Sequence, residues 1–276
     1  MKVAQKVFVV TGGGNGIGRA LVLALLARGA RVAAVDVGEQ ALADTALLVP
    51  TGADRLSTHV VDVTDRAAVE ALPAAVLAAH GQVDGVVSVA GIIQKFVPVA
   101  DLTYAEIEKI MAVNFWGVVH MSKTFLPHLT GRPEACLVNV SSMGALAPVP
   151  GQSAYGASKA AVKLFTEGLY AELRDTPVAV TAVFPGGVAT DISANSGVTV
   201  AGADGGDSSG MVQTTAPDAA AQIVAGIEKG AFRVVIGKDA RMTDRMARLA
   251  PRRAVNLIAD RMKSLLAPAG REKVGA

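Results

Sequence analysis

The sequence has 276 residues, of which 51% are hydrophobic and 18% are charged, and its formal net charge is +2. A chain of this length and composition can bury the large core of a single globular domain. Only 4% of the residues are aromatic, which fits close packing of helices on a sheet and argues against a stacking surface for nucleic acid.

Nothing near the N-terminus or in the longest apolar run indicates export or a membrane span. Residues 6–10 continue directly into glycines, so this run is too short for a signal-peptide core. Arg28 and Arg31 interrupt the apolar segment 20–35, which lacks the roughly 20 residues that a spanning helix needs. Cys136 is the only cysteine and lies in an apolar run. We therefore expect a cytoplasmic protein without stable membrane insertion.

Short Val-rich runs alternate along the chain with longer segments of helical periodicity. This alternation predicts a doubly wound, Rossmann-type α/β fold with a seven-stranded parallel sheet flanked by helices. The ligand crevice of such a fold lies outside the carboxyl ends of the strands. The predicted strands are residues 6–10, 31–36, 56–63, 84–90, 135–141, 178–184 and 233–237, and the predicted helices are 16–28, 39–48, 65–79, 103–129, 153–174 and 216–229.

We expect residues 1–240 to form one domain and residues 241–276 to form a helical extension, which Pro251 should divide into two helices. The extension has apolar residues at helical spacing with arginines between them. It could lie on a membrane surface, but Asp244 and Asp260 interrupt its basic face and favour packing over a loop or a neighbouring subunit.

The first predicted strand runs into the glycine-rich turn TGGGNGIG, residues 11–18, and then into a helix. Glycines let a backbone turn tightly and approach a pyrophosphate, and the helix N-terminus offers free N–H groups and a positive dipole end. In this position the turn predicts a dinucleotide site. The residues concerned are Gly12, Asn15, Gly16, Ile17 and Gly18.

Asp36 ends the second predicted strand, where an acid accepts hydrogen bonds from the adenosine ribose and repels a 2′-phosphate. Asn15 and Val37 provide no cation for such a phosphate. NAD(H) is therefore favoured over NADP(H). Arg19 could bind a phosphate, but we expect it to point into solvent from the first helical turn.

Tyr155 and Lys159 are four residues apart in a helical segment, so their side chains share one face. A cation beside a phenol favours the phenolate and brings its pKa towards the range useful for proton transfer. An isolated pair of this kind is more often a surface tyrosine beside a solvated lysine. The other motifs favour the catalytic interpretation.

The TGGGNGIG turn, Asn114, Ser142 and the YGASK pentad together resemble the short-chain dehydrogenase/reductase family over about residues 5–240. The resemblance implies that Tyr155 is the proton-transfer residue and that Ser142 hydrogen-bonds the substrate oxygen. It further implies that Lys159 lowers the Tyr155 pKa and holds the nicotinamide ribose. Asn114 would anchor a water in a proton relay. The offset of thirteen residues to Tyr155 favours Ser142 over Ser141 as the substrate-binding hydroxyl.

The same resemblance implies further cofactor contacts after the third, fourth and sixth strands. An adenine pocket, a close approach beside the fourth strand and a carboxamide-binding segment are expected. The residues are Asp62, Val63, Ala90, Gly91, Pro185, Gly186, Val188 and Thr190, besides Tyr155 and Lys159. One departure is Val89, where the family usually has an asparagine that helps to tie the sheet together, so local support of the sheet is in question.

Apolar residues on the loops after the fourth and fifth strands predict a pocket for a hydrophobic or bulky substrate. They are Ile92, Ile93, Phe96, Met143, Leu146 and Val149. The expected substrate contacts are Ser142, Tyr155, Ile92, Met143 and Gly187. The Gly/Ser/Asp-rich segment 195–210 lies in a substrate loop of about 191–215 and is either a lid or a disordered insertion.

We thus expect an NAD(H)-dependent short-chain alcohol dehydrogenase or ketone reductase acting on a small-molecule secondary alcohol or ketone. A non-catalytic NAD-binding sensor and an epimerase or dehydratase relative are the alternatives. The resemblance implies a homotetramer or dimer built through the helices that carry Asn114 and Tyr155. The four histidines are scattered, so no metal site is expected.

Overall fold

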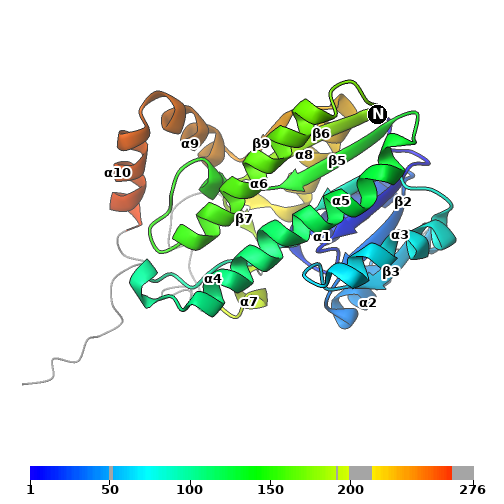
Figure 1. Cartoon of the computed structure of the whole chain (residues 1–276), viewed down its shortest axis with the longest axis horizontal. Coiled ribbons are helices and arrows are strands. Elements are labelled where there is room, and N and C mark those ends of the chain that lie inside the picture. The colour runs from blue at the N-terminus through cyan, green and yellow to red at the C-terminus, as the bar shows by residue number, and fades with distance from the viewer. Residues whose placement is uncertain (50–51, 191, 199–212, 263–276) are drawn as a thin grey trace, which may run out of the picture.

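Seven parallel strands form the central sheet of the computed structural model, which describes residues 1–49, 52–190, 192–198 and 213–262 (Figure 1). Each strand overlaps one predicted run, although several ends differ, and the predicted doubly wound fold is confirmed. Across the sheet the order is β3 (Leu56–Val60), β2 (Arg31–Asp36), β1 (Val7–Thr11), β4 (Gly85–Ser88), β5 (Ala135–Val140), β6 (Val178–Pro185) and β9 (Arg233–Ile236).

Helices cover both faces of this sheet and bury its central strands on both sides. Apolar residues of α1 and α8 pack on one face, and those of α3, α5 and α6 pack on the other. The helices are α1 (Gly16–Ala27), α2 (Glu39–Leu47), α3 (Arg66–His80), α4 (Tyr104–Met111), α5 (Gly117–Thr130), α6 (Ser153–Glu172), α7 (Ile192–Asn195), α8 (Ala216–Lys229), α9 (Lys238–Leu249) and α10 (Pro251–Arg261).

The segment predicted as one long helix over residues 103–129 is divided by a π-helical turn. The turn spans Ala112–Trp116 and joins α4 to α5. Single π turns inside α-helices often occur at functional sites. Here the turn carries Asn114, whose side chain is fully buried. Apolar periodicity does not distinguish such a turn from a regular helix.

Strand order reverses between β1 and β4, which places the ligand crevice at the carboxyl ends of these two strands. Thr11 supports this position, since its Oγ1 accepts hydrogen bonds from the N–H groups of Val89, at 3.0 Å, and Ala90, at 3.1 Å. The turn after β4 is therefore tied to β1 although Val89 has no polar side chain.

A small second sheet of two parallel strands was not predicted. It pairs β7 (Val188–Ala189) with β8 (Thr214–Thr215). Two-residue strands are too short to give a periodic signal in the sequence. Of the predicted substrate loop, residues 191 and 199–212 lie outside the described residues.

The C-terminal extension forms two helices, with Pro251 at the first position of α10, as expected. Figure 1 shows α9 and α10 together at the end of the molecule towards which the strands point. There α9 lies against the 3-10 turn Met143–Ala145 that follows β5. Within the described ranges, no helix is long and apolar enough to cross a membrane.

Candidate active site

Ser142 and Tyr155 face each other just beyond the carboxyl end of β5. Ser142 Oγ accepts a hydrogen bond of 3.0 Å from the Gly144 N–H. A Cβ at Gly144 would lie 3.5 Å from both Ser142 Oγ and the Tyr155 ring, so the two side chains come close to the same point. Two hydroxyl groups are thus directed at one point above the sheet.

Burial raises the pKa of the Tyr155 phenol, and a hydrogen bond from Ser142 opposes that rise. Lys159 is only 4% exposed, and burial lowers its pKa to about 8. Its Nζ donates a hydrogen bond of 3.1 Å to the Val140 carbonyl. The expected depression of the Tyr155 pKa by Lys159 is not seen in the protein alone, because the low-dielectric surroundings disfavour both charged forms.

Asn114 and Lys159 converge at Gly91. A Cβ at Gly91 would lie 3.1 Å from Asn114 Oδ1 and from Lys159 Nζ. Asn114 Oδ1 accepts from the Ile92 N–H at 2.9 Å, while Nδ2 donates to the Ile92 carbonyl and to Ser158 Oγ, each at 3.0 Å. The Asn114 side chain therefore fixes the loop after β4 next to the lysine.

The adjacent residue Ser141 has a different environment from Ser142. It is buried, and its Oγ donates a hydrogen bond of 2.7 Å to the Lys159 carbonyl. Successive side chains of a strand point to opposite sides, so Ser141 supports α6 while Ser142 faces Tyr155.

Gln94 belongs to this group, and sequence reasoning missed it. Its side chain is 3% exposed. Its Oε1 accepts a hydrogen bond of 3.0 Å from the Tyr155 N–H, and its Nε2 donates to the Gly151 carbonyl. In return, Gln152 Nε2 donates to the Gln94 carbonyl at 2.7 Å. A buried glutamine on a loop has no distinguishing pattern in the sequence.

The glycine turn has the geometry that a pyrophosphate requires. Gly12 and Gly16 have positive φ angles of 69° and 50°, which disfavour other residues. A Cβ at Gly18 would overlap the Gly12 carbonyl, so only glycine allows α1 to start this close to β1. The first N–H groups of α1 have no partner within the helix and are available to an anion. The turn therefore fits a dinucleotide.

Asp36 lies beside this turn, as predicted. Its carboxylate accepts hydrogen bonds from the N–H groups of Gly14, at 2.9 Å, and Gly38, at 3.0 Å. The prediction that Arg19 points into solvent is wrong. Its Nε donates to Thr45 Oγ1 at 3.0 Å and its Nη2 to Asn15 Oδ1 at 3.4 Å, because Thr45 on α2 provides an acceptor within reach. Val37 is 68% exposed.

The two residues predicted for the adenine pocket, Asp62 and Val63, differ in whether their side chains are exposed or buried. Asp62 Oδ1 accepts hydrogen bonds of 2.8 Å from the N–H and the hydroxyl of Thr64. The Val63 side chain is buried against Gly117, and its carbonyl is 2.9 Å from His120 Nδ1. Only the backbone of Val63 is left to meet a ligand.

The predicted carboxamide segment meets the glycine turn across the crevice. A Cβ at Gly16 would lie 3.2 Å from the Thr190 methyl group. At the start of the segment, after Pro185, the Gly186 N–H donates to the Ile236 carbonyl at 2.9 Å and the Gly187 N–H donates to Asp239 at 2.7 Å. Segments more than 170 residues apart thus converge on one site.

The predicted apolar substrate residues lie on the loops that follow β4 and β5. Ile92, Phe96, Met143, Leu146 and Val149 are all partly exposed. The loop after β4 also contacts the start of the substrate loop. The Ile93 N–H donates a hydrogen bond of 3.0 Å to the Oγ of Ser196, which directly follows α7. In the part of the chain that the structure describes, no cluster of His, Cys, Asp or Glu could hold a metal ion.

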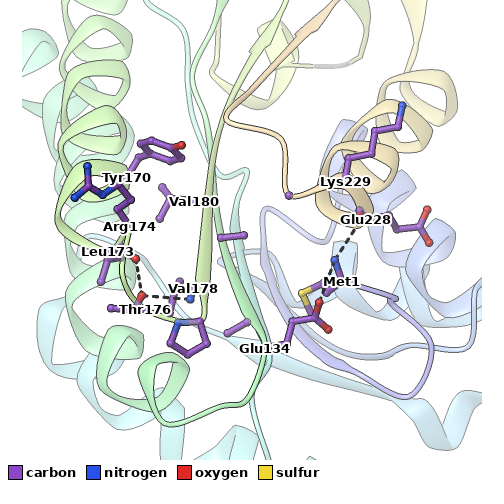
Figure 2. A pocket seen from close by; sticks show the side chains of 14 residues that line it. Met1, Glu134, Tyr170, Leu173, Arg174, Thr176, Val178, Val180, Glu228 and Lys229 are labelled. Atoms are coloured by element: carbon purple, nitrogen blue, oxygen red, sulfur yellow. Dashed lines mark hydrogen bonds and ion pairs between the residues drawn. The ribbon is translucent and has the colours of Figure 1, made fainter.

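A cavity of about 330 Å³ lies elsewhere and takes no part in this site. Figure 2 shows it between Met1, Glu134, Tyr170 and Lys229. These residues border the N-terminal ends of β5 and β6, at the edge of the sheet opposite Ser142 and Tyr155.

Known proteins resemble this chain in sequence and in fold. A family model described as short chain dehydrogenase matches residues 6–201. SadH of Mycobacterium tuberculosis, whose name proposes an oxidoreductase, is 41% identical over 254 residues, which are 88% of this chain and 90% of SadH.

Two solved structures have the same fold. A short-chain dehydrogenase/reductase from Burkholderia phymatum, in complex with NAD, matches with a TM-score of 0.81 and 28% identity and covers 93% of this chain and 97% of its own. A short-chain dehydrogenase from Burkholderia cenocepacia, in complex with NADP, matches with a TM-score of 0.76 and 27% identity. The match covers 97% of this chain and 100% of the other.

Proposed function

Because the chain belongs to the short-chain dehydrogenase/reductase family, an oxidoreductase family, we propose that it interconverts a secondary alcohol and a ketone with NAD(H). The observation that carries the proposal is the convergence of Ser142, Tyr155 and Lys159 at the carboxyl edge of the sheet, next to the glycine turn. Such a site pairs a proton donor with a nucleotide crevice.

Tyr155 is the general acid or base of the proposed reaction. Its phenol donates a proton to the ketone oxygen in reduction and accepts one from the alcohol in oxidation. Ser142 donates a hydrogen bond to the same oxygen and stabilises the charge that develops there. The buried Lys159 lies next to Asn114 and Gly91, from where its ammonium can favour the phenolate of Tyr155.

The cofactor, when bound, supplies or accepts the hydride. The N–H groups at the start of α1 would hold its pyrophosphate and Asp36 its adenosine ribose. Lys159 would hold the nicotinamide ribose, and Val188 and Thr190 the carboxamide. The preference for NAD(H) rests on the Asp36 carboxylate, since structurally similar proteins have been solved with either NAD or NADP.

A hydrophobic or bulky substrate is part of the proposal. Ile92 and Met143 are partly exposed on the loops after β4 and β5, beside Ser142 and Tyr155. Apolar side chains in this position would bind an alkyl or ring substituent and leave the polar atoms to the two hydroxyls. Preference for a small, highly charged substrate over apolar ketones in a substrate panel would refute this part.

The single experiment that tests the function compares the wild-type protein with Tyr155→Phe. We expect the substitution to abolish turnover, followed by nicotinamide absorbance, while NADH binding stays within about twofold, because the ring is kept and only the proton donor is lost. A sensor would show NADH binding without turnover in the wild type. Product formation without net change in NADH would favour an epimerase or dehydratase.

We also propose that a second copy of the chain covers a groove between α5 and α6. Val119, Leu126, Phe165 and Leu169 line it, and its volume is about 580 Å³. The two helices are those through which the family resemblance predicts assembly. Leu126→Arg should convert a dimer or tetramer to a smaller species in light scattering, and a wild-type monomer would contradict the proposal.

A cytoplasmic location is supported by the single buried thiol, Cys136.

A further inference from the structure

We infer that Asp239, at the start of α9, is a positioning residue that fixes the nicotinamide side of the cofactor crevice. The inference rests on the proposed function and adds a residue that none of the sequence motifs indicates. Asp239 Oδ2 accepts a hydrogen bond of 2.7 Å from the Gly187 N–H, across 52 residues of sequence. A hydrogen bond between a carboxylate and a backbone N–H is stronger than one between neutral groups.

Glycines make room for this carboxylate. A Cβ at Gly186 or at Gly237 would overlap Asp239 Oδ1, and Gly237 has a φ of 96°, which few other residues adopt. The carboxylate is therefore seated between two backbone segments, the turn after β6 and the turn after β9. In this position the carboxylate occupies space that a side chain on either glycine would need.

Both backbone groups of Gly187 are thereby held. Asp239 holds its N–H, and its carbonyl accepts a hydrogen bond of 2.9 Å from the Thr214 N–H. Val188 and Thr190 follow directly, and the Thr190 methyl group lies against Gly16 of the glycine turn. Loss of the Asp239 contact would remove one of the hydrogen bonds that fix the segment expected to meet the carboxamide, whereas the pyrophosphate and adenosine sites lie on other elements.

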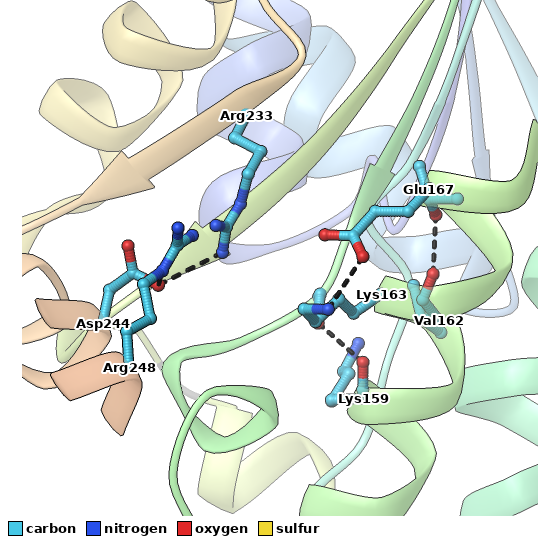
Figure 3. A network of polar contacts seen from close by, with 9 residues as sticks. Lys159, Val162, Lys163, Glu167, Arg233, Asp244 and Arg248 are labelled. Carbon is cyan, nitrogen blue, oxygen red and sulfur yellow. Dashed lines mark hydrogen bonds and ion pairs between the residues drawn. The ribbon is translucent and has the colours of Figure 1, made fainter. Parts of the chain in front are cut away.

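The carboxylate can position this segment because α9 is itself fixed. Figure 3 shows Asp244, further along α9, between Arg233 and Arg248. Asp244 Oδ1 lies 3.3 Å from Arg233 Nη2 and 3.0 Å from Arg248 Nε. The Arg233 guanidinium in turn stacks 4.5 Å from the centre of the Phe184 ring. The helix is thus tied to β9 and β6 independently of Asp239.

A ligand that lacks nicotinamide separates positioning of the cofactor from general support of the fold. We would measure the affinities of the full chain for NADH and for ADP-ribose by calorimetry. Asp239→Ala should weaken NADH binding about tenfold or more, because a charge-assisted hydrogen bond is lost, and should leave ADP-ribose binding within about twofold. Asp239→Asn retains an acceptor for the Gly187 N–H, so its NADH affinity should lie between those of the wild type and Asp239→Ala.

Asp260→Ala is the matched control, because it removes an exposed carboxylate from the neighbouring helix α10 and leaves both Gly187 and the Asp244 anchor of α9 unchanged. It should leave both affinities within about twofold of the wild type. Unchanged NADH binding in Asp239→Ala, or equal losses for NADH and ADP-ribose in both Asp239 variants, would overturn the inference alone. A wild type that binds neither ligand would overturn the proposed function and the inference together.

Discussion

Gln94 accepts a hydrogen bond of 3.0 Å from the backbone N–H of Tyr155, although 61 residues separate them. Tyr155 is in the first turn of α6, where backbone N–H groups have no partner within the helix. The Gln94 side chain therefore caps the helix that presents the proposed proton donor, and it does so from the loop that also carries Ile92.

The Gln94→Leu substitution tests this tether. It leaves the Tyr155 N–H and the Gly151 carbonyl without partners in a buried place, so we expect the free energy of unfolding to fall by about 2–4 kcal/mol. We also expect kcat to fall more than KM rises, since the donor is displaced. Urea unfolding and steady-state kinetics measure the two effects. A loss of stability with unchanged kcat would show that the tether supports only the fold.

Thr11 provides the polar anchor that Val89 lacks. Thr11→Val keeps the shape of the side chain but leaves two N–H groups, those of Val89 and Ala90, without their acceptor. We expect a loss of about 2–4 kcal/mol in the free energy of unfolding. Thr11→Ser keeps the hydroxyl and should recover most of the loss. Equal stability of the valine and serine variants would contradict the assignment.

Lys159 should make stability depend on pH in a specific window. Its pKa is lowered by burial from 10.5 to about 8, so between these values the unfolded chain binds more protons than the folded one. Stability contributed by this group therefore rises with pH through the window and is lowest below about pH 8. Relative to Lys159→Met, the wild type should gain about 2 kcal/mol between about pH 7 and about pH 9.5.

Urea unfolding at both pH values measures this difference. The methionine variant retains Tyr155, so comparing the two proteins isolates the lysine. A constant difference in the free energy of unfolding across the window would contradict the lowered pKa. The same variant should lose turnover, because the cation proposed to favour the Tyr155 phenolate is gone.

Asp36 and Arg19 together should decide between the two nicotinamide cofactors. Asp36→Asn removes the charge that repels a 2′-phosphate and keeps an acceptor oxygen beside Gly14. We expect the ratio of kcat/KM for NADH to that for NADPH to fall about tenfold or more.

Arg19→Ala in the Asp36→Asn background is the informative second step. The Arg19 guanidinium lies next to Asn15, so its loss should lower NADPH use again while NADH use changes little. A wild type that uses NADPH as well as NADH would refute the argument from Asp36 before any variant is made.

Local patterns in the sequence were sufficient for the elements and for one part of the site. The predicted runs correspond to the seven strands, and the central strands β1, β4 and β5 gave the clearest signal because a strand buried on both faces is largely apolar. The glycine turn was predictable because positive φ angles and a close helix start require glycine. Tyr155 and Lys159 were predictable because a spacing of four residues brings side chains together on any helix.

Contacts between distant segments had no such signature. Gln94, the inward course of Arg19 and the pairing of β7 with β8 depend on which segment lies opposite in the folded chain. The pKa of Tyr155 shows the same limit. Spacing to Lys159 predicted a lowered value, but burial, which is a property of the whole fold, raises it.

The sequence by itself indicated the fold, the glycine turn and the residues proposed as the acid–base pair, because each pattern involves residues close together in the chain. Only the tertiary structure decided that Gln94 caps the helix of Tyr155 and that Asp239 holds Gly187. Those hydrogen bonds join residues 61 and 52 positions apart. Their partners become neighbours only when the parallel strands bring their carboxyl ends to one edge.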